Sequence, residues 1–249
     1  MSILRVLSSL VLLSGEYGFG VAVIRPLISG YERPVIIENI NFSFGPWQIS
    51  EKSHFCVGSL LNDRWVVTTA RCGVTPSSVV HLPDSFFGIQ RKSLRNARVF
   101  EHPEYNSETS TNDIALIKLS SPLTISEAVS LISPDSGSDT TNKGDNCITT
   151  KAGYATDSKA NSEDSQEVTV PILTSDECKK LWGTKSQRNT ICTDVSSCMV
   201  DGGAALVCER NGTKILAGIA SSSCSTSKPA IFTDISSYRD WIDQTIQDN

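Results

Sequence analysis

Few side chains in this sequence can take a proton from a nucleophile near neutral pH. The only histidines are His54, His81 and His102, and histidine is the usual general base at that pH. His102 lies in Glu-His-Pro-Glu-Tyr, which is typical of a surface segment. The adjacent hydroxyls of Ser196 and Ser197 need such a base to act as nucleophiles, and none is placed beside them. These side chains therefore do not by themselves predict a complete catalytic centre.

The N-terminus and the cysteines indicate a secreted protein. One arginine, a short apolar run and small residues make residues 1–18 a predicted signal peptide, cleaved between Gly18 and Ala22. The alternative is a buried first element of the fold. Eight cysteines behind such a leader predict four disulfides, although their spacing alone does not pair them. Asn41 and Asn211 lie in glycosylation sequons.

Composition limits the fold and the partners. The chain has 249 residues and 39% hydrophobic content, enough for one large all-β domain or two small ones. The net charge is −5, and acidic and basic residues are interspersed without a basic stripe. We therefore expect neither nucleic acid nor a membrane as a partner. No cysteine–histidine spacing indicates a metal site, and we expect no cofactor.

Short β-type runs separated by turn residues recur after Trp47, and they predict an antiparallel sandwich or barrel. The expected strands cover residues 48–50, 64–69, 97–101, 114–119, 147–150, 167–170, 205–209, 215–220 and 230–235. The Ser-, Asp-, Thr- and Gly-rich segment 133–144 is interpreted as a connector between two subdomains. Apolar residues at helical spacing predict a C-terminal helix over about 236–247, with Ser236 or Ser237 as its N-cap.

Three blocks resemble the chymotrypsin family of serine proteases, and two further segments look close to pancreatic chymotrypsinogens. The blocks are His54-Phe-Cys-Val-Gly-Ser-Leu-Leu with Trp65-Val-Val-Thr-Thr-Ala-Arg-Cys72, then Asn112-Asp-Ile-Ala-Leu-Ile-Lys-Leu119, then Val195-Ser-Ser-Cys-Met-Val-Asp-Gly-Gly-Ala-Ala-Leu-Val-Cys208. The two further segments cover residues 176–183 and 224–229. The resemblance runs from about residue 19 to the C-terminus.

This resemblance implies an all-β fold of two antiparallel six-stranded Greek-key β-barrels with a C-terminal α-helix. The barrels are expected over about 45–123 and 146–235. Both belong to a protease-like (peptidase S1) domain of residues 34–249, preceded by a propeptide-like segment, 19–33. The family pattern also implies the disulfides Cys56–Cys72, Cys147–Cys208, Cys178–Cys192 and Cys198–Cys224, which use every cysteine once.

The chemistry of the family needs a serine nucleophile, a histidine base and an aspartate that orients the histidine. Arg71 stands at the histidine position, and arginine stays protonated near neutral pH. Gly202 stands at the serine position, so no hydroxyl is available there. Asp113 alone of the triad remains. The resemblance therefore implies a serine protease homologue that is not an active enzyme.

Other parts of the machinery also depart from the family pattern. Val200 replaces an oxyanion-hole glycine and resists a positive φ. The specificity pocket is expected at Ser196, Ser223 and Ala230, and the last of these narrows it. The substrate strand, usually Ser-Trp-Gly, has lost its aromatic platform, because serines occupy all of 221–223.

Activation is also expected to be blocked. The activation arginine matches Arg33, but Pro34 follows it, and an Arg–Pro bond is a poor substrate for trypsin-like proteases. Without cleavage we expect a permanent zymogen-like state, in which Asp201 pairs with His54. The alternative leaves Asp201 solvated and His54 simply packed.

Arg71 and Asp113 are expected to form a salt bridge in place of the catalytic pair. In the alternative, the Arg71 side chain points out to water.

Three functions fit these observations. The first is a secreted pseudoprotease that acts by binding protease inhibitors, zymogens or other proteins, as a monomer. The second is a decayed duplicate with no selected function. The third is an active serine endopeptidase, as family membership by itself implies.

Overall fold

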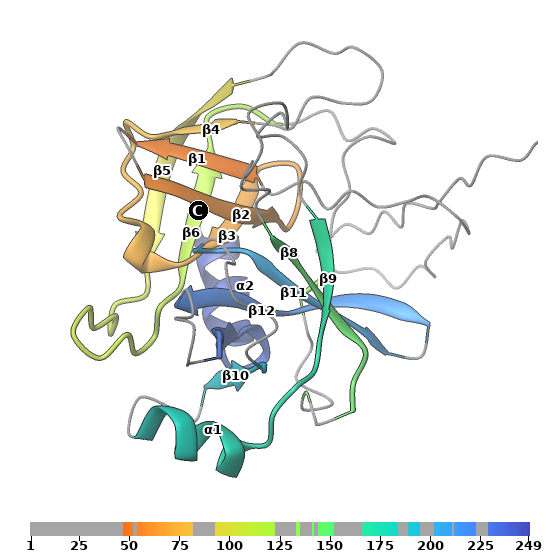
Figure 1. Ribbon diagram of the computed structural model, residues 1–249. Coiled ribbons are helices and arrows are strands. Elements are labelled where there is room, and N and C mark those ends of the chain that lie inside the picture. The colour runs from red at the N-terminus through yellow and green to blue at the C-terminus, as the bar shows by residue number, and fades with distance from the viewer. Residues whose placement is uncertain are drawn as a thin grey trace, which may run out of the picture.

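Two curled antiparallel sheets, built one after the other along the chain, form the body of the computed structural model (Figure 1). The structure describes residues 47–51, 54–81, 93–122, 133–134, 141, 144–151, 166–183, 189–194, 202–210, 212–222 and 229–249. The predicted signal peptide and the propeptide-like segment lie outside these ranges.

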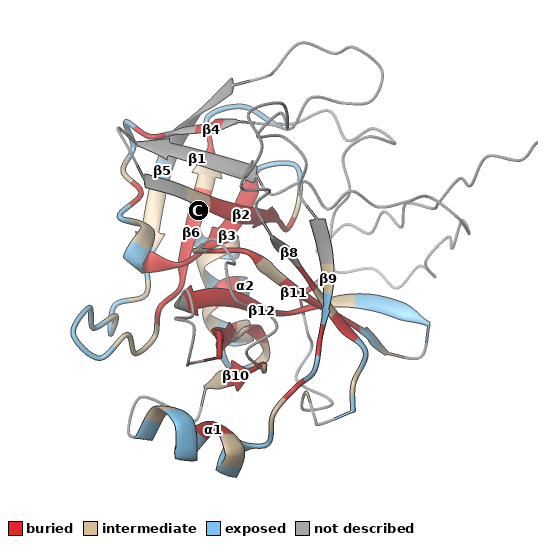
Figure 2. Cartoon of the chain, in the orientation of Figure 1, coloured by how far each residue is buried: buried red, intermediate tan, exposed pale blue. Residues whose placement is uncertain are grey.

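The first sheet is a closed six-stranded barrel in the order β1-β2-β3-β6-β5-β4, because β1 also pairs with β4. Its strands are β1 (Trp47–Glu51), β2 (His54–Leu60), β3 (Trp65–Thr68), β4 (Val79–His81), β5 (Ser93–Glu101) and β6 (Ala115–Leu119). Every residue of β3 is buried, as is most of β6 (Figure 2). The strand predictions missed β2 and β4 here, as well as two short strands of the second sheet, Ser133–Pro134 and Thr190–Cys192, and they started β5 too late.

The second sheet repeats this strand order. It runs β10-β13-β12-β11-β8-β9, with the short β7 added parallel to β12. Its members are β7 (Ser133–Pro134), β8 (Cys147–Lys151), β9 (Gln166–Val170), β10 (Thr190–Cys192), β11 (Ala205–Arg210), β12 (Thr213–Ser222) and β13 (Ile231–Asp234). Taking β8 to β13 as equivalents of β1 to β6 gives the same paired neighbours except for β9 and β10, the equivalents of β2 and β3, so both sheets have one Greek-key arrangement.

The second sheet curls until the segments that follow its two outer strands, β9 and β10, come into contact. The segment after β9 contacts the segment after β10 through an Ile172–Thr193 bridge and through the hydrogen bond from Leu173 N–H to the Cys192 carbonyl, at 2.9 Å. The predicted chymotrypsin-type architecture of antiparallel β-barrels with a C-terminal helix is therefore confirmed.

One apolar cluster joins the two sheets. It contains residues from the first barrel, such as Trp65 and Leu116, together with Leu216 and Ile219 from the second sheet and Ile242 from the C-terminal helix. All of these side chains are at most 4% exposed. The two sheets therefore share a continuous core, which holds the residues on either side of their junction in a definite relation.

The C-terminal helix begins later than predicted. A 3₁₀ turn, η4 (Ile235–Tyr238), comes first, and helix α2 spans Arg239–Asp248. The side chain of Asp234 accepts the Ser236 N–H at 3.0 Å, so Asp234 caps the turn. The prediction of a serine N-cap is wrong: the N-cap of α2 is Tyr238, which makes no side-chain cap hydrogen bond, and the two serines lie inside the preceding turn.

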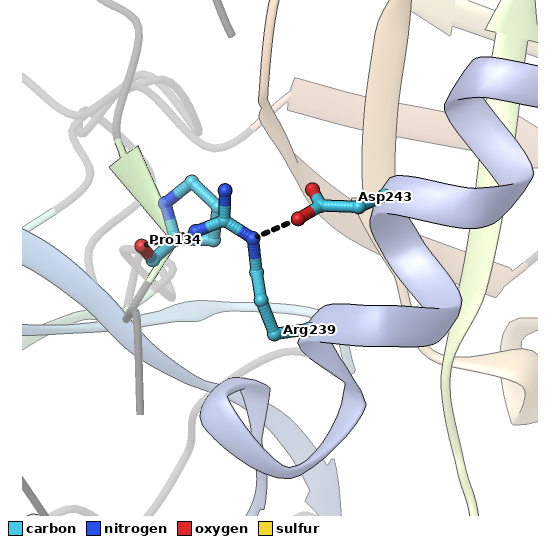
Figure 3. A network of polar contacts seen from close by, with 3 residues as sticks. All are labelled: Pro134, Arg239 and Asp243. Carbon is cyan, nitrogen blue, oxygen red and sulfur yellow. Dashed lines mark hydrogen bonds and ion pairs between the residues drawn. The ribbon is translucent and has the colours of Figure 1, made fainter. Parts of the chain in front are cut away.

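The start of α2 is also tied to the strand β7. The guanidinium of Arg239 bonds the Asp243 carboxylate one turn along the helix, at 2.7 Å, and reaches the Pro134 carbonyl at 3.4 Å (Figure 3). Pro134 is buried. Strand β7, which lies between the two barrels in the sequence, is thus held against helix α2.

A second helix, α1 (Ser175–Trp182), was not among the predicted elements. Thr174 and Glu177 form a capping box at its start: the Thr174 hydroxyl accepts the Glu177 N–H, and the Glu177 carboxylate accepts the Thr174 N–H. Among the described residues, no helix is long and apolar enough to cross a membrane.

Three of the four implied disulfides are confirmed. Cys56–Cys72 joins β2 to η1 (Ala70–Cys72), a 3₁₀ turn that follows β3. Cys147–Cys208 links the neighbouring strands β8 and β11, and Cys178–Cys192 ties α1 to β10. The fourth pair, Cys198–Cys224, lies outside the described residues.

Candidate functional site

Residues far apart in the sequence meet where the two sheets join. Arg71 lies on η1 at the end of β3, and Asp113 lies just before β6. Gly202 precedes β11, and Ser221 lies near the end of β12. The hydrogen bond from Val57 N–H to the Gly202 carbonyl, at 2.9 Å, joins β2 of the first barrel to the second sheet. The three positions that the resemblance assigns to the catalytic triad are thus brought to one junction.

Asp113 is the buried centre of this site, with 1% of its surface exposed. Its Oδ1 accepts the backbone N–H of Arg71 at 2.8 Å, and its Oδ2 accepts the Ser221 hydroxyl at 2.6 Å. Its backbone carbonyl accepts the Thr233 hydroxyl at 2.9 Å. These bonds hold the carboxyl group in one orientation.

Burial has the largest influence on the pKa of the Asp113 carboxyl group. Desolvation raises the pKa of this carboxyl above its ordinary value of 3.8, because the charged form loses water. The Ser221 hydroxyl, the Arg71 N–H and the Arg71 guanidinium lower the pKa and offset part of that rise. The site therefore holds a carboxyl group that is costly to ionise.

The prediction of a salt bridge between the Arg71 and Asp113 side chains is wrong. In the part of the chain that the structure describes, no ion pair joins them, and the Arg71 guanidinium donates to the backbone carbonyl of Ser221 instead. Arg71 is exposed, so the alternative orientation toward water is closer to what is found. The Asp113 carboxylate is bonded instead by the Arg71 backbone N–H at Oδ1 and by the Ser221 hydroxyl at Oδ2.

Gly202 leaves the nucleophile position without a side chain. A Cβ placed on it would lie 3.2 Å from Cys56 Sγ and 3.6 Å from Cys72 Sγ. The next residue, Gly203, has φ +84°, and a Cβ there would lie 1.9 Å from the Val57 carbonyl oxygen. Position 203 therefore requires glycine, whereas position 202 is tight but has no such backbone constraint.

Several predicted site residues are not tested by this geometry. Ala230 is fully buried, and its carbonyl accepts the Thr193 N–H at 3.2 Å. His54 pairs through its backbone with Glu51 in the first barrel; its predicted contact with Asp201 falls on a residue outside the described ranges. The other predicted positions outside those ranges are Arg33, Pro34, Asn41, Ser196, Val200, Asn211 and Ser223.

Sequence reasoning missed three functional contacts. Ser221 was noted only as part of the substrate strand, yet it donates to Asp113. Thr233 donates to the carbonyl of the same residue. Thr69, before η1, contacts Cys72 Sγ at 3.1 Å. The two bonds to Asp113 have no local sequence signal, because they join residues more than 100 positions apart; the Thr69 contact spans only three residues.

The described residues contain no group of three or more His, Cys, Asp and Glu side chains that could hold a metal ion. The site described above consists of a carboxyl group, three hydroxyls, a guanidinium and a disulfide: Asp113; Ser221, Thr233 and Thr69; Arg71; and Cys56–Cys72. Comparison with known protein families matches residues 39–242 to the Trypsin family. This range includes both sheets and every residue of the site described above. The chain belongs to the trypsin family.

Proposed function

We propose that this chain is a secreted, catalytically inactive trypsin-family protein that acts by binding other proteins. The observation that carries the proposal is the pair of replacements around Asp113. Gly202 provides no hydroxyl at the nucleophile position, and Arg71 provides a permanent cation at the base position. A trypsin-family domain with several disulfides is typical of extracellular proteins.

The contacts of Arg71 support the loss of general-base chemistry. A catalytic histidine accepts a proton from the nucleophile, and the buried aspartate orients its ring. Here Asp113 is bonded to the Arg71 backbone and to the Ser221 hydroxyl. The guanidinium is turned to a backbone carbonyl, where it acts as a donor. No proton can be taken up at this position near neutral pH.

The retained scaffold supports a binding role. Both sheets, the shared core and three described disulfides are kept although the two chemical groups are missing. The partners of such a scaffold would be protease inhibitors, zymogens or other proteins. Binding of substrates in the manner of an active protease is the weaker form of this idea. The Ser221 carbonyl belongs to the strand expected to pair with a substrate, and it already accepts a hydrogen bond from the Arg71 guanidinium.

The first test asks whether the protein can catalyse. The secreted form is treated with trypsin and then assayed with a panel of chromogenic peptides and with a fluorophosphonate label for active serines. We expect no cut at Arg33, no label and no turnover, since loss of serine or histidine in a related protease costs about 10⁶ in turnover. Label or turnover that co-purifies with the protein would support the active-endopeptidase alternative instead.

The matched control restores the missing groups. The double variant Arg71→His, Gly202→Ser introduces the missing imidazole and hydroxyl and leaves Asp113 and Ser221 unchanged. A labelled double variant and an unlabelled parent would show that these two positions account for the inactivity. If the parent is labelled, the hydroxyl responsible is sought at Ser196 and Ser197.

The second test asks whether the protein binds. Purified Kunitz-type and serpin-type inhibitors, and trypsinogen, are titrated against the protein by calorimetry. Saturable binding to at least one of them supports the binding role. No binding to any of these probes would favour a decayed duplicate without a selected function.

A further inference from the structure

The three described disulfides differ in their access to solvent. Cys147 and Cys208 are 0% exposed, and Cys178 and Cys192 are 3% exposed. Cys56 and Cys72 are only partly buried. Thiol–disulfide exchange needs direct approach of a thiolate to a sulfur atom, so Cys56–Cys72, whose residues are the most exposed, is the most accessible of these three bridges.

Gly202 brings its missing side chain closest to one sulfur. A Cβ at this position would lie 3.2 Å from Cys56 Sγ and 3.6 Å from Cys72 Sγ. Glycine therefore places no side chain against the disulfide from this position, and Cys56 Sγ is the nearer of the two sulfurs.

The other sulfur has a hydrogen-bond donor. Thr69 Oγ1 lies 3.1 Å from Cys72 Sγ, and a disulfide sulfur carries no hydrogen, so the hydroxyl must donate. The neighbouring Thr68 hydroxyl donates to the Val57 carbonyl at 2.8 Å and lies farther from Cys72 Sγ, at 3.6 Å, so Thr69 is the nearer donor to this sulfur. A donor on the departing sulfur stabilises the thiolate that forms when the bond breaks.

We propose that Cys56–Cys72 is a thiol-exchange site, with Cys56 as the attacked sulfur and Cys72 as the leaving group. The reactant is the thiolate of a small thiol, such as reduced glutathione, or of a dithiol protein. The thiolate bonds to Cys56 Sγ, the bond between the two protein sulfurs breaks, and its electron pair leaves on Cys72 as a thiolate. A second thiol then releases Cys56, so two thiols are oxidised to one disulfide and the protein gains two electrons.

Exchange at this bridge would alter the candidate site. Cys72 is the last residue of η1, and the residue before it donates its backbone N–H to Asp113. Opening the bridge releases η1 from β2, to which the disulfide anchors it. The redox state would thereby set how firmly Arg71 is held beside Asp113. This inference goes beyond the proposed function and does not depend on whether the protein is inactive.

The test uses the full secreted chain in native buffer with increasing reduced glutathione. Samples are quenched with acid and alkylated, and each cysteine is mapped by peptide mass spectrometry. We expect Cys56–Cys72 to open at least about tenfold faster than Cys147–Cys208 and Cys178–Cys192, with the glutathione adduct on Cys56. Equal rates for the three bridges would overturn the proposal, and an adduct mainly on Cys72 would overturn its direction.

Two variants separate the contributions. Thr69→Val removes the donor and is expected to slow exchange about fivefold, the value of one ordinary hydrogen bond. Gly202→Ala adds a Cβ beside Cys56 Sγ. This variant is also expected to open Cys56–Cys72 more slowly than the parent. Thr149→Val is the control, because it removes another buried hydroxyl, one that donates to the Ala205 carbonyl.

The two buried bridges report on folding in the same samples. A variant that merely unfolds would speed exchange at all three disulfides. A selective change at Cys56–Cys72 is therefore the supporting result. Unchanged Cys56–Cys72 rates in both Thr69→Val and Gly202→Ala would refute the assigned roles of the hydroxyl and of the missing side chain.

Discussion

Replacing Asp113 by alanine should cost this protein a large part of its stability, even if the residue no longer serves catalysis. The carboxyl is 1% exposed and accepts two hydrogen bonds, from the Ser221 hydroxyl and from the Arg71 N–H. The first bond is buried and the second is partly buried. Alanine would leave both donors without this acceptor.

The magnitude follows from these two bonds. Loss of a buried bond to a carboxylate costs about 1.5–3 kcal/mol, and a partly buried backbone bond costs about 0.5–1.5 kcal/mol. Relief of the desolvated charge offsets part of this cost. We therefore expect Asp113→Ala to lower the free energy of unfolding by about 2–4 kcal/mol. Asp113→Asn keeps an acceptor for Arg71 and a polar group for Ser221, so it should cost less than about 1 kcal/mol.

The assay is urea unfolding with intact disulfides, followed by tryptophan fluorescence. A double-mutant cycle with Ser221→Ala tests the contact itself, and a coupling energy of at least about 1 kcal/mol is expected. Additive effects of the two alanine substitutions would refute the assigned hydrogen bond. Equal losses from Asp113→Ala and Asp113→Asn at neutral pH would refute the argument from unsatisfied donors.

The pH dependence provides a further check on the same residue. Because burial raises the pKa of Asp113, the folded state binds its proton more readily than the unfolded state does. The stability from this group is therefore present in acid and is lost as the pH rises from about 3.8 through the folded pKa. The stability of Asp113→Asn relative to the parent should accordingly increase as the pH rises through this window. A difference that shrinks over that window would contradict the assigned shift.

Three other perturbations have definite expected outcomes. Gly203→Ala should cost at least about 2 kcal/mol in urea unfolding, because its Cβ would meet a backbone carbonyl of β2; Gly212→Ala, also at positive φ but with nothing within 4 Å, should cost about 1 kcal/mol. Burial lowers the pKa of His102 from 6.5, so stability should fall as the pH drops below that value, and His102→Gln should remove this dependence in pH-resolved unfolding. Thr174→Ala breaks the capping box of α1 and should cost about 1 kcal/mol by the same urea assay, whereas an unchanged midpoint would show that this cap adds nothing.

The amino-acid sequence by itself determined the chemical inventory of the site. No hydroxyl can arise at Gly202 and no neutral base at Arg71 near pH 7, whatever the fold. The alternation of apolar residues located most strands, and the family resemblance supplied the order of the barrels and the three confirmed disulfides. The chemical inventory and the strands follow from residue type and short-range pattern, whereas the barrel order and the disulfide pairs came from the family resemblance and not from the spacing of the cysteines.

The tertiary structure alone decided where the charged and polar groups point. Arg71 and Ser221 are separated by 150 positions and meet only because the two sheets share one core. A guanidinium on a long flexible side chain can reach several acceptors, and the folded chain places that of Arg71 on the Ser221 carbonyl and not on the Asp113 carboxylate. The start of the C-terminal helix also depended on the fold, because a 3₁₀ turn capped by Asp234 precedes it and includes both serines that the sequence suggested as caps. Hydrogen-bond partners that meet only when distant strands pack together leave no periodic pattern in the amino-acid sequence.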